Sequence, residues 1–448
     1  MKILAIETSC DDTCAAVLDN DKVLSNIISS QTDLHSKWGG VVPDIAKRAH
    51  ESRINAVIAE ALLRSKFLIS NFQFLNNNEE KVNKIIEEGM KEIDVIGVTL
   101  GPGLAIALGI GVNKAKELAL KYNKKLVAVN HIEGHIWANF LKNKNGKPER
   151  KLELPALALT VSGGHTKIIL IKQDDQFSIF NFQFSNQNQG QNLLKSPSAM
   201  PLSPLIKGEA KTQSPPTPFF DPPSLKDTDW QKNTGNKKNP PVPINRDILL
   251  QRGRKSLELK PIYTVVGETL DDAAGEALDK AAKMLGLGYP GGPIIERLAQ
   301  TGDINYLDLP HPLADKKILD YSFSGLKTSF YYKVKDWPKE KIYENLNNLA
   351  ATFQNAVFET LLRKYKLAIE KYQPKMLLAS GGVLANLELR KRLRKLAKEM
   401  NLPIYMPTHK NLNTDNAAMI GRVAYNKALL EEYVGDVDSL DRDPRLHI

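Results

Sequence analysis

The chain begins with the apolar run Ile3-Leu4-Ala5-Ile6-Glu7, the turn Thr8-Ser9-Cys10-Asp11-Asp12-Thr13 and a second apolar run, Cys14-Ala15-Ala16-Val17-Leu18. Two short apolar runs on either side of a polar turn are typical of a β-hairpin. A second unit of the same kind occurs later, as Ala156-Leu157-Ala158-Leu159-Thr160-Val161, Ser162-Gly163-Gly164-His165-Thr166 and Ile168-Ile169-Leu170-Ile171. The sequence therefore predicts two hairpins whose turns are rich in hydroxyl groups or glycines.

Each predicted hairpin is followed downstream by a buried strand, a pair of glycines and a helix. Residues 95–100 precede Gly101-Pro102-Gly103-Leu104, and residues 376–379 precede Ser380-Gly381-Gly382-Val383. The repetition predicts two similar α/β halves that share a cleft. Backbone N–H groups in such turns and at helix N-termini bind phosphate oxygens, so a nucleotide is the expected ligand. One glycine-rich turn alone would be weak evidence, because many such turns only relieve backbone strain.

The segment His131-Ile132-Glu133-Gly134-His135 carries two histidines one helical turn apart, so that both imidazoles lie on one helix face. They can bind one metal ion together with a distant carboxylate, for which Asp415 in Thr414-Asp415-Asn416-Ala417-Ala418 is the candidate. Two histidines that cap or pack a helix explain the same spacing. The zinc-protease pattern is absent, because Glu133 stands two residues after the first histidine and faces another side of the helix.

Length and composition fit a two-domain globular protein with insertions. The chain has 448 residues, of which 42% are hydrophobic and 25% charged. It contains no apolar run of membrane-spanning length and enters a strand at once without a signal-peptide pattern, so we expect neither membrane insertion nor export. Cys10 and Cys14 are the two cysteines, which favours a reduced, cytoplasmic protein.

The net charge of +10 is unevenly distributed along the sequence. Residues 185–260 contain 12 Lys or Arg, 6 Asp or Glu and 11 of the 25 prolines, and they show neither a helical nor a strand period. We interpret this stretch as a disordered insertion, and residues 67–91 as a second, smaller insertion. The overall positive charge is therefore poor evidence for a basic groove on the folded part.

Taken together and in order, the motifs resemble one family along nearly the whole chain, the tRNA N6-adenosine threonylcarbamoyltransferases, once described as O-sialoglycoprotein endopeptidases. The version Ser-Gly-Gly-His-Thr resembles the bacterial or organellar branch. The resemblance rests on the first hairpin, on the stretches 101–104, 131–135, 161–166 and 267–280, and on the stretches 289–293, 323–328, 380–386 and 414–418.

The resemblance implies a duplicated, actin-like and sugar-kinase-like ATPase fold with two domains around a nucleotide- and metal-binding cleft. The domains would be residues 1–130 and 131–448, with the last helix, about 414–431, packing back on the N-terminal half. The family transfers the threonylcarbamoyl group of threonylcarbamoyl-adenylate to N6 of adenosine 37 in tRNAs that read codons beginning with A. The implied partners are tRNA, a catalytically inactive paralogue and a small P-loop ATPase.

Residue by residue, the resemblance implies three groups of site residues. Asp11 would lie next to the reacting carbonyl. Two imidazoles and a carboxylate suit Fe(II) and Zn(II) alike, and we expect Fe(2+), with Zn(2+) as the alternative. The metal ligands would be His131, His135 and Asp415, and the adenylate contacts would be Thr160, Val161, Ser162, Gly163, Gly164, Asp279, Gly292 and Asn386.

Several of these residues also have a plain structural interpretation. Asp11 either takes the proton of the adenine amine or stabilises its turn. Asp279 binds ribose hydroxyls or lies on a solvated helix face, and Asn386 contacts substrate, caps a helix, or does both. His165 positions phosphate or holds its turn together. Lys327 contacts the tRNA backbone or is a surface lysine.

Two other classes of protein use part of this pattern. A metallo-endopeptidase would use the two histidines and leave the nucleotide turns idle. An actin-like chaperone or kinase would use the turns and would not need His131 and His135. An inactive paralogue would be expected to lack the complete metal triad. The transferase is the hypothesis that uses both sets of residues.

Overall fold

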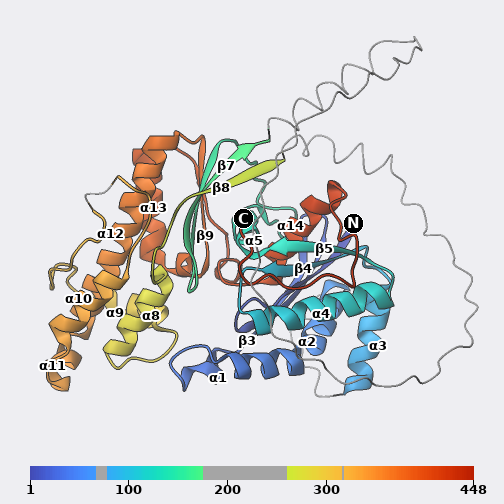
Figure 1. Ribbon diagram of the computed structural model, residues 1–448, viewed down its shortest axis with the longest axis horizontal. Coiled ribbons are helices and arrows are strands. Elements are labelled where there is room, and N and C mark those ends of the chain that lie inside the picture. Colours follow the sequence, from blue (N-terminus) through green and yellow to red (C-terminus); the bar gives the residue numbers. More distant parts are fainter. Residues whose placement is uncertain (67–77, 175–259, 315–316) are drawn as a thin grey trace, which may run out of the picture. The chain divides into compact units, whose positions relative to one another are not determined.

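The computed structural model describes residues 1–66, 78–174, 260–314 and 317–448, which contain two five-stranded sheets (Figure 1). The first sheet has the order β3-β2-β1-β4-β5. Its first three strands are antiparallel, whereas β1, β4 and β5 are parallel. Its strands are β1 (Lys2–Glu7), β2 (Asp12–Asp19), β3 (Lys22–Ser30), β4 (Val95–Gly101) and β5 (Lys125–Asn130).

The second sheet repeats the first in strand order and in strand direction. Its order is β10-β9-β6-β7-β8, with β6, β7 and β8 antiparallel and β6, β9 and β10 parallel. Both predicted hairpins are present, and the duplicated actin-like α/β fold is confirmed. The strands are β6 (Ala156–Val161), β7 (Thr166–Gln173), β8 (Pro261–Glu268), β9 (Met376–Ser380) and β10 (Ile404–Tyr405).

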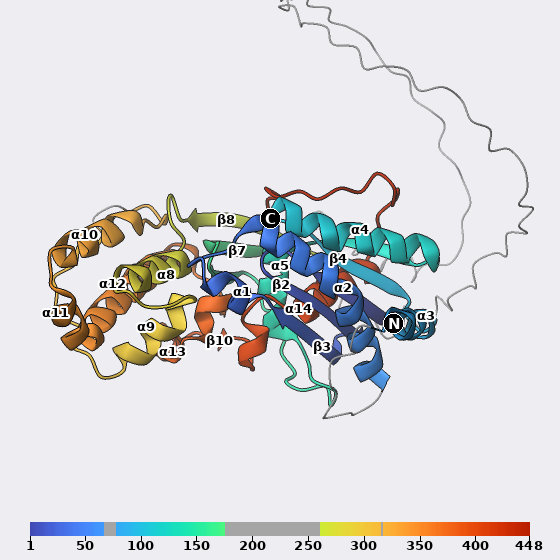
Figure 2. The ribbon, with the colours of Figure 1, turned by 90° about the horizontal axis from the view of Figure 1, so that it is seen from below.

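Helices cover both faces of the first sheet, because alternate residues of a strand point to opposite sides. Leu4 and Ile6 of β1 join a core with α2, α3 and α4, whereas Ile3 and Ala5 join a core with α14 (Figure 2). The helices of the first half are α1 (Thr32–Ser36), α2 (Pro43–Lys66), α3 (Glu79–Met90), α4 (Ala105–Lys121) and α5 (His131–Trp137), followed by the 3-10 turn η1 (Ala138–Phe140).

The second sheet is covered in the same way. Leu157 and Leu159 of β6 face a core with α8 and α12, and Ala156 and Ala158 face Ile132 and other residues of α5. The helices of this half are α8 (Ala274–Met284), α9 (Gly291–Ala299), α10 (Ser324–Val334), α11 (Lys339–Glu344), α12 (Leu346–Tyr372), α13 (Leu387–Glu399) and α14 (Ala417–Leu429), with the 3-10 turns η2 (Gly382–Ala385) and η3 (Lys410–Leu412).

The helices α5 and α14 exchange positions between the two sheets. α5 follows the last strand of the first sheet but packs on the second, and α14 follows the last strand of the second sheet but packs on the first. The two helices also contact each other, because Gly134 leaves room for Met419 and Ile420. This exchange brings sequence positions near 131 and near 415 together.

Some sequence expectations differ from the structure or lie outside it. Helix α8 begins only at Ala274, inside the motif stretch 267–280, because the Asp271 carboxylate accepts hydrogen bonds from the backbone N–H groups of Phe323 and Ser324 and holds the preceding residues in a turn. Within the predicted insertion 67–91, residues 79–90 form α3, and 67–77 lie outside the described residues. The stretch 185–260 also lies outside them, except for Lys260. None of the described helices could cross a membrane.

The close approach of α14 to the first sheet depends on Gly97 of β4. A Cβ atom at this position would lie 2.6 Å from the Cβ of Ala424. We predict that Gly97→Ala lowers the free energy of unfolding by about 1–3 kcal/mol, the usual cost of overpacking, as measured by denaturant titration.

Two variants control this prediction. Gly97→Ala combined with Ala424→Gly should recover much of the loss, because it removes the colliding methyl group. Gly435→Ala should have little effect, because nothing lies within 4 Å of a Cβ there. An equal loss in the single and double variants would contradict the packing argument.

Candidate metal and nucleotide site

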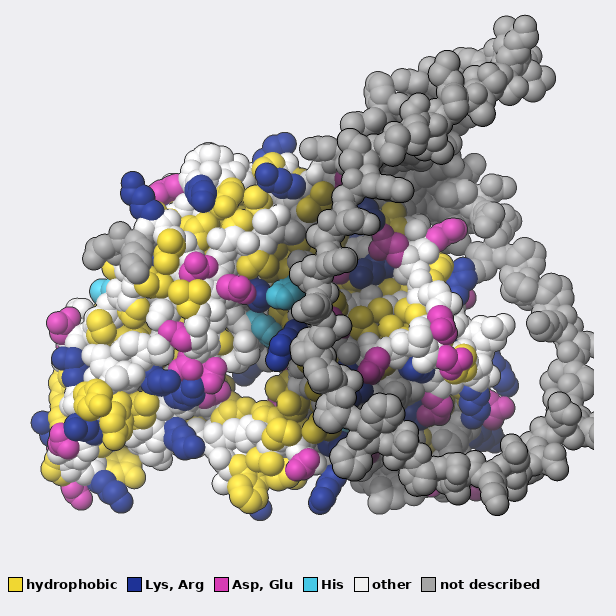
Figure 3. All heavy atoms as spheres, in the orientation of Figure 1, with side chains coloured by type: hydrophobic (Ala, Val, Ile, Leu, Met, Phe, Trp, Pro, Cys, Tyr) yellow, Lys and Arg dark blue, Asp and Glu magenta, His cyan; other side chains and the backbone are white. Residues whose placement is uncertain are grey.

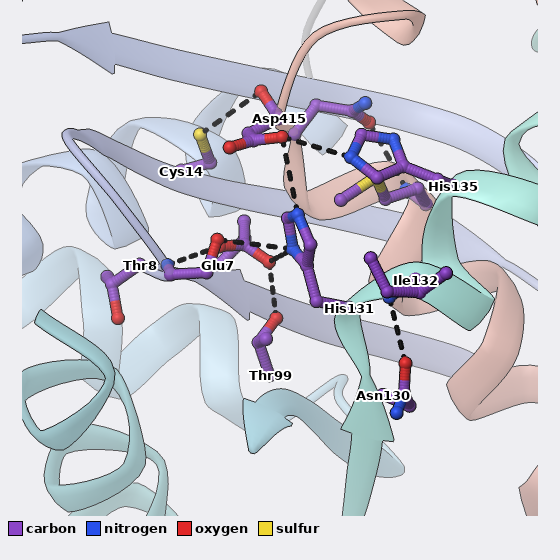
Figure 4. Close-up of polar contacts among 12 residues, drawn as sticks. Glu7, Thr8, Cys14, Thr99, Asn130, His131, Ile132, His135 and Asp415 are labelled. Atoms are coloured by element: carbon purple, nitrogen blue, oxygen red, sulfur yellow. Dashed lines mark hydrogen bonds and ion pairs between the residues drawn. The ribbon is translucent and has the colours of Figure 1, made fainter. Parts of the chain in front are cut away.

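The two histidines of α5 are positioned by the start of that helix. Asn130, the last residue of β5, caps α5 by accepting hydrogen bonds from the backbone N–H groups of Ile132 and Glu133. His131 and His135 then lie on the same helix face, both buried. Their Nε2 atoms lie 3.5 Å and 3.1 Å from the same oxygen, Oδ1 of Asp415 (Figure 4).

These three side chains fit a metal site. Their ligand atoms all lie within 4.8 Å of one another. Two atoms that share an ion at about 2.1 Å lie about 3.0–3.4 Å apart, close to both histidine-to-carboxylate distances. Neither ring nitrogen of His135 makes an aligned hydrogen bond with any described residue, although its Nε2 lies 3.1 Å from the Asp415 carboxylate.

A fourth residue, Glu7, supports the first histidine from behind. Its Oε2 lies 3.0 Å from Nδ1 of His131 and accepts a 2.5 Å hydrogen bond from Oγ1 of Thr99. Ser9 Oγ lies 3.1 Å from the same imidazole nitrogen. With Nδ1 engaged, Nε2 is left to face Asp415. A carboxylate in this position commonly orients a metal-binding histidine.

Sequence reasoning overlooked Glu7 as a site residue, although a glutamate at the end of an apolar strand was a usable signal. Burial raises the pKa of Glu7, but the charge of His131 and their hydrogen bond lower it more. Burial lowers the pKa of His131, yet the charges of Glu7 and Asp415 raise it to about 10. The site therefore strongly favours a positive charge among its two carboxylates.

The second hairpin turn lies against the start of α8. The Ser162 N–H donates to the His165 carbonyl over 2.7 Å, and the Ser162 hydroxyl accepts from the His165 N–H over 3.1 Å. The Cβ positions of Gly163 and Gly164 are open, whereas a Cβ on Gly275 would meet the Ser162 carbonyl at 2.7 Å. The exposed glycine backbone thus stands beside a helix N-terminus, which suits an anion.

The strand ends beneath this turn hold two buried hydroxyl groups. Thr160 of β6 pairs with Ser380 of β9 in the sheet register. Neither side-chain oxygen has a hydrogen-bond partner among the described residues. Val161, between Thr160 and the turn, is buried in the core. Ser380 was not singled out from the sequence, and its orphaned hydroxyl makes it a further candidate.

Gly292 and Asn386 lie at helix N-termini, and the side chain of Asp279, from the middle of α8, contacts the N-terminus of α9. Asp279 Oδ1 accepts hydrogen bonds from the N–H groups of Gly291 and Gly292, over 2.7 Å and 3.1 Å, at the start of α9. Burial raises the pKa of Asp279. Asn386 caps α13 by accepting from the Leu389 N–H, and its amide donates to the buried Gln354. The capping role considered for Asn386 is therefore present.

Asp11 lies in the first hairpin turn, between β1 and β2. Burial is the largest cause of the raised pKa of the neighbouring Asp12 and of Tyr289, and the negative charge of Asp11 is the next largest. The charge of Asp11 also contributes to the raised pKa of Asp279. Asp11 is therefore within electrostatic reach of the Asp279 carboxylate, which belongs to the other half of the sequence.

His165 and Lys327 have structural contacts. The rings of His165 and His131 have centroids 6.1 Å apart, and burial followed by the charges of His131 and His135 lowers the pKa of His165 to about 3. This imidazole is therefore neutral. Lys327 forms a 2.6 Å ion pair with Asp272, which partly neutralises its charge.

Comparison with known proteins shows the family to which the chain is similar. A family model described as tRNA N6-adenosine threonylcarbamoyltransferase (TsaD) matches residues 22–74, 77–223 and 247–422. Curated relatives with that name include one from Thermosipho africanus, 34% identical over 448 residues and 100% of both chains. Another, from Kosmotoga olearia, is 36% identical over 428 residues, 96% of this chain and 94% of its own.

Among solved structures, HypF from T. kodakarensis is 14% identical, with 98% of this chain and 49% of that chain covered and a TM-score of 0.45. The ROK hexokinase from Thermus thermophilus is 10% identical, with 96% and 100% covered and a TM-score of 0.38.

The fold and the match define a transferase class whose name implies tRNA as the substrate. The chain belongs to the tRNA N6-adenosine threonylcarbamoyltransferase family, and the resemblance seen in its motifs is confirmed.

We predict that the carboxyl group of Asp12 makes the stability of the protein depend on pH. Burial and the charge of Asp11 raise its pKa to about 7, and its Oδ1 has no partner among the described residues. In the unfolded chain the value is about 3.9, so the folded state binds the proton more tightly and stability falls as pH rises from about 4 to 7. Asp12→Asn, which is always neutral, should therefore stabilise the protein more at pH 8 than at pH 5.

Denaturant unfolding at both pH values measures this difference. Asp19→Asn, at the opposite end of β2 with a half-exposed side chain, is the matched control and should show no such gain. A pH-independent effect of Asp12→Asn would show that the carboxyl group does not titrate in this range.

Proposed function

We propose that this protein transfers the threonylcarbamoyl group from threonylcarbamoyl-adenylate to N6 of adenosine 37 in tRNAs that read codons beginning with A. The observation that carries the proposal is family membership over the full chain together with a histidine–aspartate cluster. The expected chemistry needs a metal site and anion-binding turns, and the chain has candidate residues for both.

The metal site would consist of His131, His135 and Asp415, and Fe(2+) is the proposed ion, with Zn(2+) as the alternative. When bound, such an ion supplies a Lewis acid that polarises a substrate oxygen. Glu7 would hold the His131 ring so that Nε2 faces the ion. The two carboxylates offset the positive charge at the site.

The adenylate would be held by backbone and side-chain groups of the second half. The N–H groups of Gly163 and Gly164, beside the α8 N-terminus, would bind the phosphate, with Thr160, Val161 and Ser162 forming the floor of the turn. Asp279, Gly292 and Asn386 would contact the nucleoside. These residues would keep the leaving AMP in place while the carbonyl is attacked.

Asp11 would act on the incoming amine. The exocyclic amine of adenine is a weak nucleophile, because its lone pair is delocalised into the ring. A carboxylate that accepts its proton as the new C–N bond forms would lower the barrier. The electrostatic influence of Asp11 on Asp279 supports a position near the adenylate.

Two rival functions have less support. A metallo-endopeptidase needs a general base at the metal, but Glu133 accepts a hydrogen bond from the Tyr263 hydroxyl and forms an ion pair with Lys427. An ATPase without transferase activity would give no role to the cluster of His131, His135 and Asp415. As partners we propose tRNA, an inactive paralogue and a small P-loop ATPase, and the cytoplasm as the location.

The transfer reaction is the direct test. Purified protein with threonylcarbamoyl-adenylate, tRNA and the proposed partners should yield modified adenosine, detected by mass measurement of tRNA nucleosides. Asp11→Asn should bind the adenylate normally but lose about 10²–10⁴-fold in rate, the usual contribution of a general base. Transfer at the parental rate in this variant would reduce Asp11 to a turn residue, and cleavage of a glycoprotein without transfer would sink the proposal.

Two glutamates, Glu7 behind His131 and Glu133 on another side of α5, test the metal assignment. Glu7→Gln keeps a side chain able to contact His131 but removes the charge, so metal affinity should fall about 10–100-fold in a chelator competition. Glu133→Gln is the control, because the side chain of Glu133 is also largely buried and lies on α5 itself, but it forms an ion pair with Lys427. Equal metal affinities in the two variants would contradict the supporting role of Glu7.

A further inference from the structure

Three segments far apart in the sequence concentrate positive charge on the described part of the chain. Residues 141–151 carry a net charge of +4, α13 (387–399) carries +4, and residues 405–413 carry +1. The whole chain carries +10, of which residues 185–260 contribute +6 and all others +4. The three segments together carry +9, so the rest of the chain outside 185–260 carries −5. We call these three segments the basic strip.

Two guanidinium groups connect the strip into one surface. Arg390 of α13 donates to the Pro407 carbonyl over 3.0 Å and to Oδ1 of Asn413 over 3.2 Å. Arg150 donates to the Met406 carbonyl over 2.9 Å and lies 4.9 Å from the ring centre of Tyr405. Both segments therefore attach to residues 405–413, and Figure 2 shows α13 beside β10.

Much of the charge on the strip is not neutralised by nearby acids. Burial lowers the pKa of Arg390, and the like charges of Arg394 and Arg150 lower it further, so both lie within electrostatic reach of Arg390. The hydrogen bonds of Arg390 and Arg150 go to uncharged oxygens. In the described part of the chain, no carboxylate lies within ion-pair distance of Lys144, Arg150, Lys151, Arg390, Arg394, Lys398 or Lys410.

This concentration is not a general property of the surface. Over α8 to α12, on the face shown in Figure 3, basic and acidic side chains are intermixed. A local excess of Lys and Arg on a chain whose remaining folded part is net negative marks a binding surface for a polyanion.

We propose that the basic strip binds the phosphodiester backbone of the tRNA substrate, which rests on the function proposed above. The strip meets the candidate metal cluster, because Asn413, the partner of Arg390, stands two residues before Asp415. RNA bound along the strip would thus reach the reacting centre. Such contacts fix register and orientation but do not read sequence.

The shape of the strip favours nucleic acid over a lipid surface. A pocket of about 500 Å³ lies between residues 141–148 and 408–412, with Lys142, Lys144, Lys147 and His409 among its lining. A concave basic surface suits a ridge of phosphates or a nucleotide turned out of a loop. The leucines Leu389, Leu393 and Leu396 of α13 are buried, so that beyond Leu387 at its first position α13 shows no apolar stripe for membrane insertion.

The test compares two full-length variants with the same net charge. The strip variant replaces six exposed residues by Gln: Lys144, Lys147, Lys151, Arg394, Lys395 and Lys398. The control variant replaces six exposed lysines on α3 and around α10 and α11: Lys81, Lys84, Lys91, Lys333, Lys335 and Lys339. Thermal unfolding checks that both fold, and unmodified tRNA binding is measured over a series of salt concentrations.

We expect the strip variant to lose about tenfold or more in tRNA affinity at low salt, with a smaller loss at high salt. The slope of log affinity against log salt should fall by about one for each phosphate contact removed. The control variant should resemble the parent. The turnover rate at saturating tRNA should be unchanged in both, because no substituted residue belongs to the proposed catalytic site.

Three outcomes would each contradict a different proposal, either the docking surface, its tRNA ligand or the transferase function. Parental affinity and salt slope in the strip variant would exclude the strip as the docking surface while leaving the transferase proposal intact. Loss of binding to vesicles containing an anionic phospholipid, with tRNA binding unchanged, would assign the strip to a membrane. Strip-dependent tRNA binding by a protein that performs no transfer would instead remove the proposed function and keep the surface.

Discussion

The Asp415 carboxylate contacts the imidazoles of His131 and His135, which come from a distant part of the sequence. This contact depends on the whole fold. The histidines follow the last strand of the first sheet, and the aspartate precedes the last helix of the chain. They meet because α5 packs on the second sheet and α14 on the first. The small residues Gly97 and Gly134 allow these helices to approach closely enough.

The electrostatics of this cluster favour a positive charge between its carboxylates. The buried carboxylate of Glu7 and the partly exposed carboxylate of Asp415 flank His131, and their charges outweigh the effect of burial on that imidazole. Two negative charges in a buried site are costly unless a cation compensates them. The same hairpin that supplies Glu7 from β1 also supplies Asp11 from its turn, so one local element would serve both the metal and the reacting amine.

The duplicated fold was predictable because its signals are local. The predictive signals were apolar runs, a turn rich in hydroxyl groups or glycines, and glycines after a buried strand. Each signal extends over about twenty residues or fewer, and both hairpins formed as expected. The start of α8 was not predictable in this way. Asp271 holds its segment in a turn by bonds to Phe323 and Ser324, residues more than fifty positions away.

The sequence by itself determined the two hairpins, the helical spacing of His131 and His135, and the family motifs, since each depends on neighbours along the chain. Only the tertiary structure decided that Glu7 lies behind His131, 124 residues away, and that Thr160 and Ser380 end side by side with hydroxyls that have no partner among the described residues. It also gathered three modestly charged segments into one basic strip, which the charges of residues 185–260 obscure in the composition. These arrangements depend on burial and long-range packing, which no local sequence pattern records.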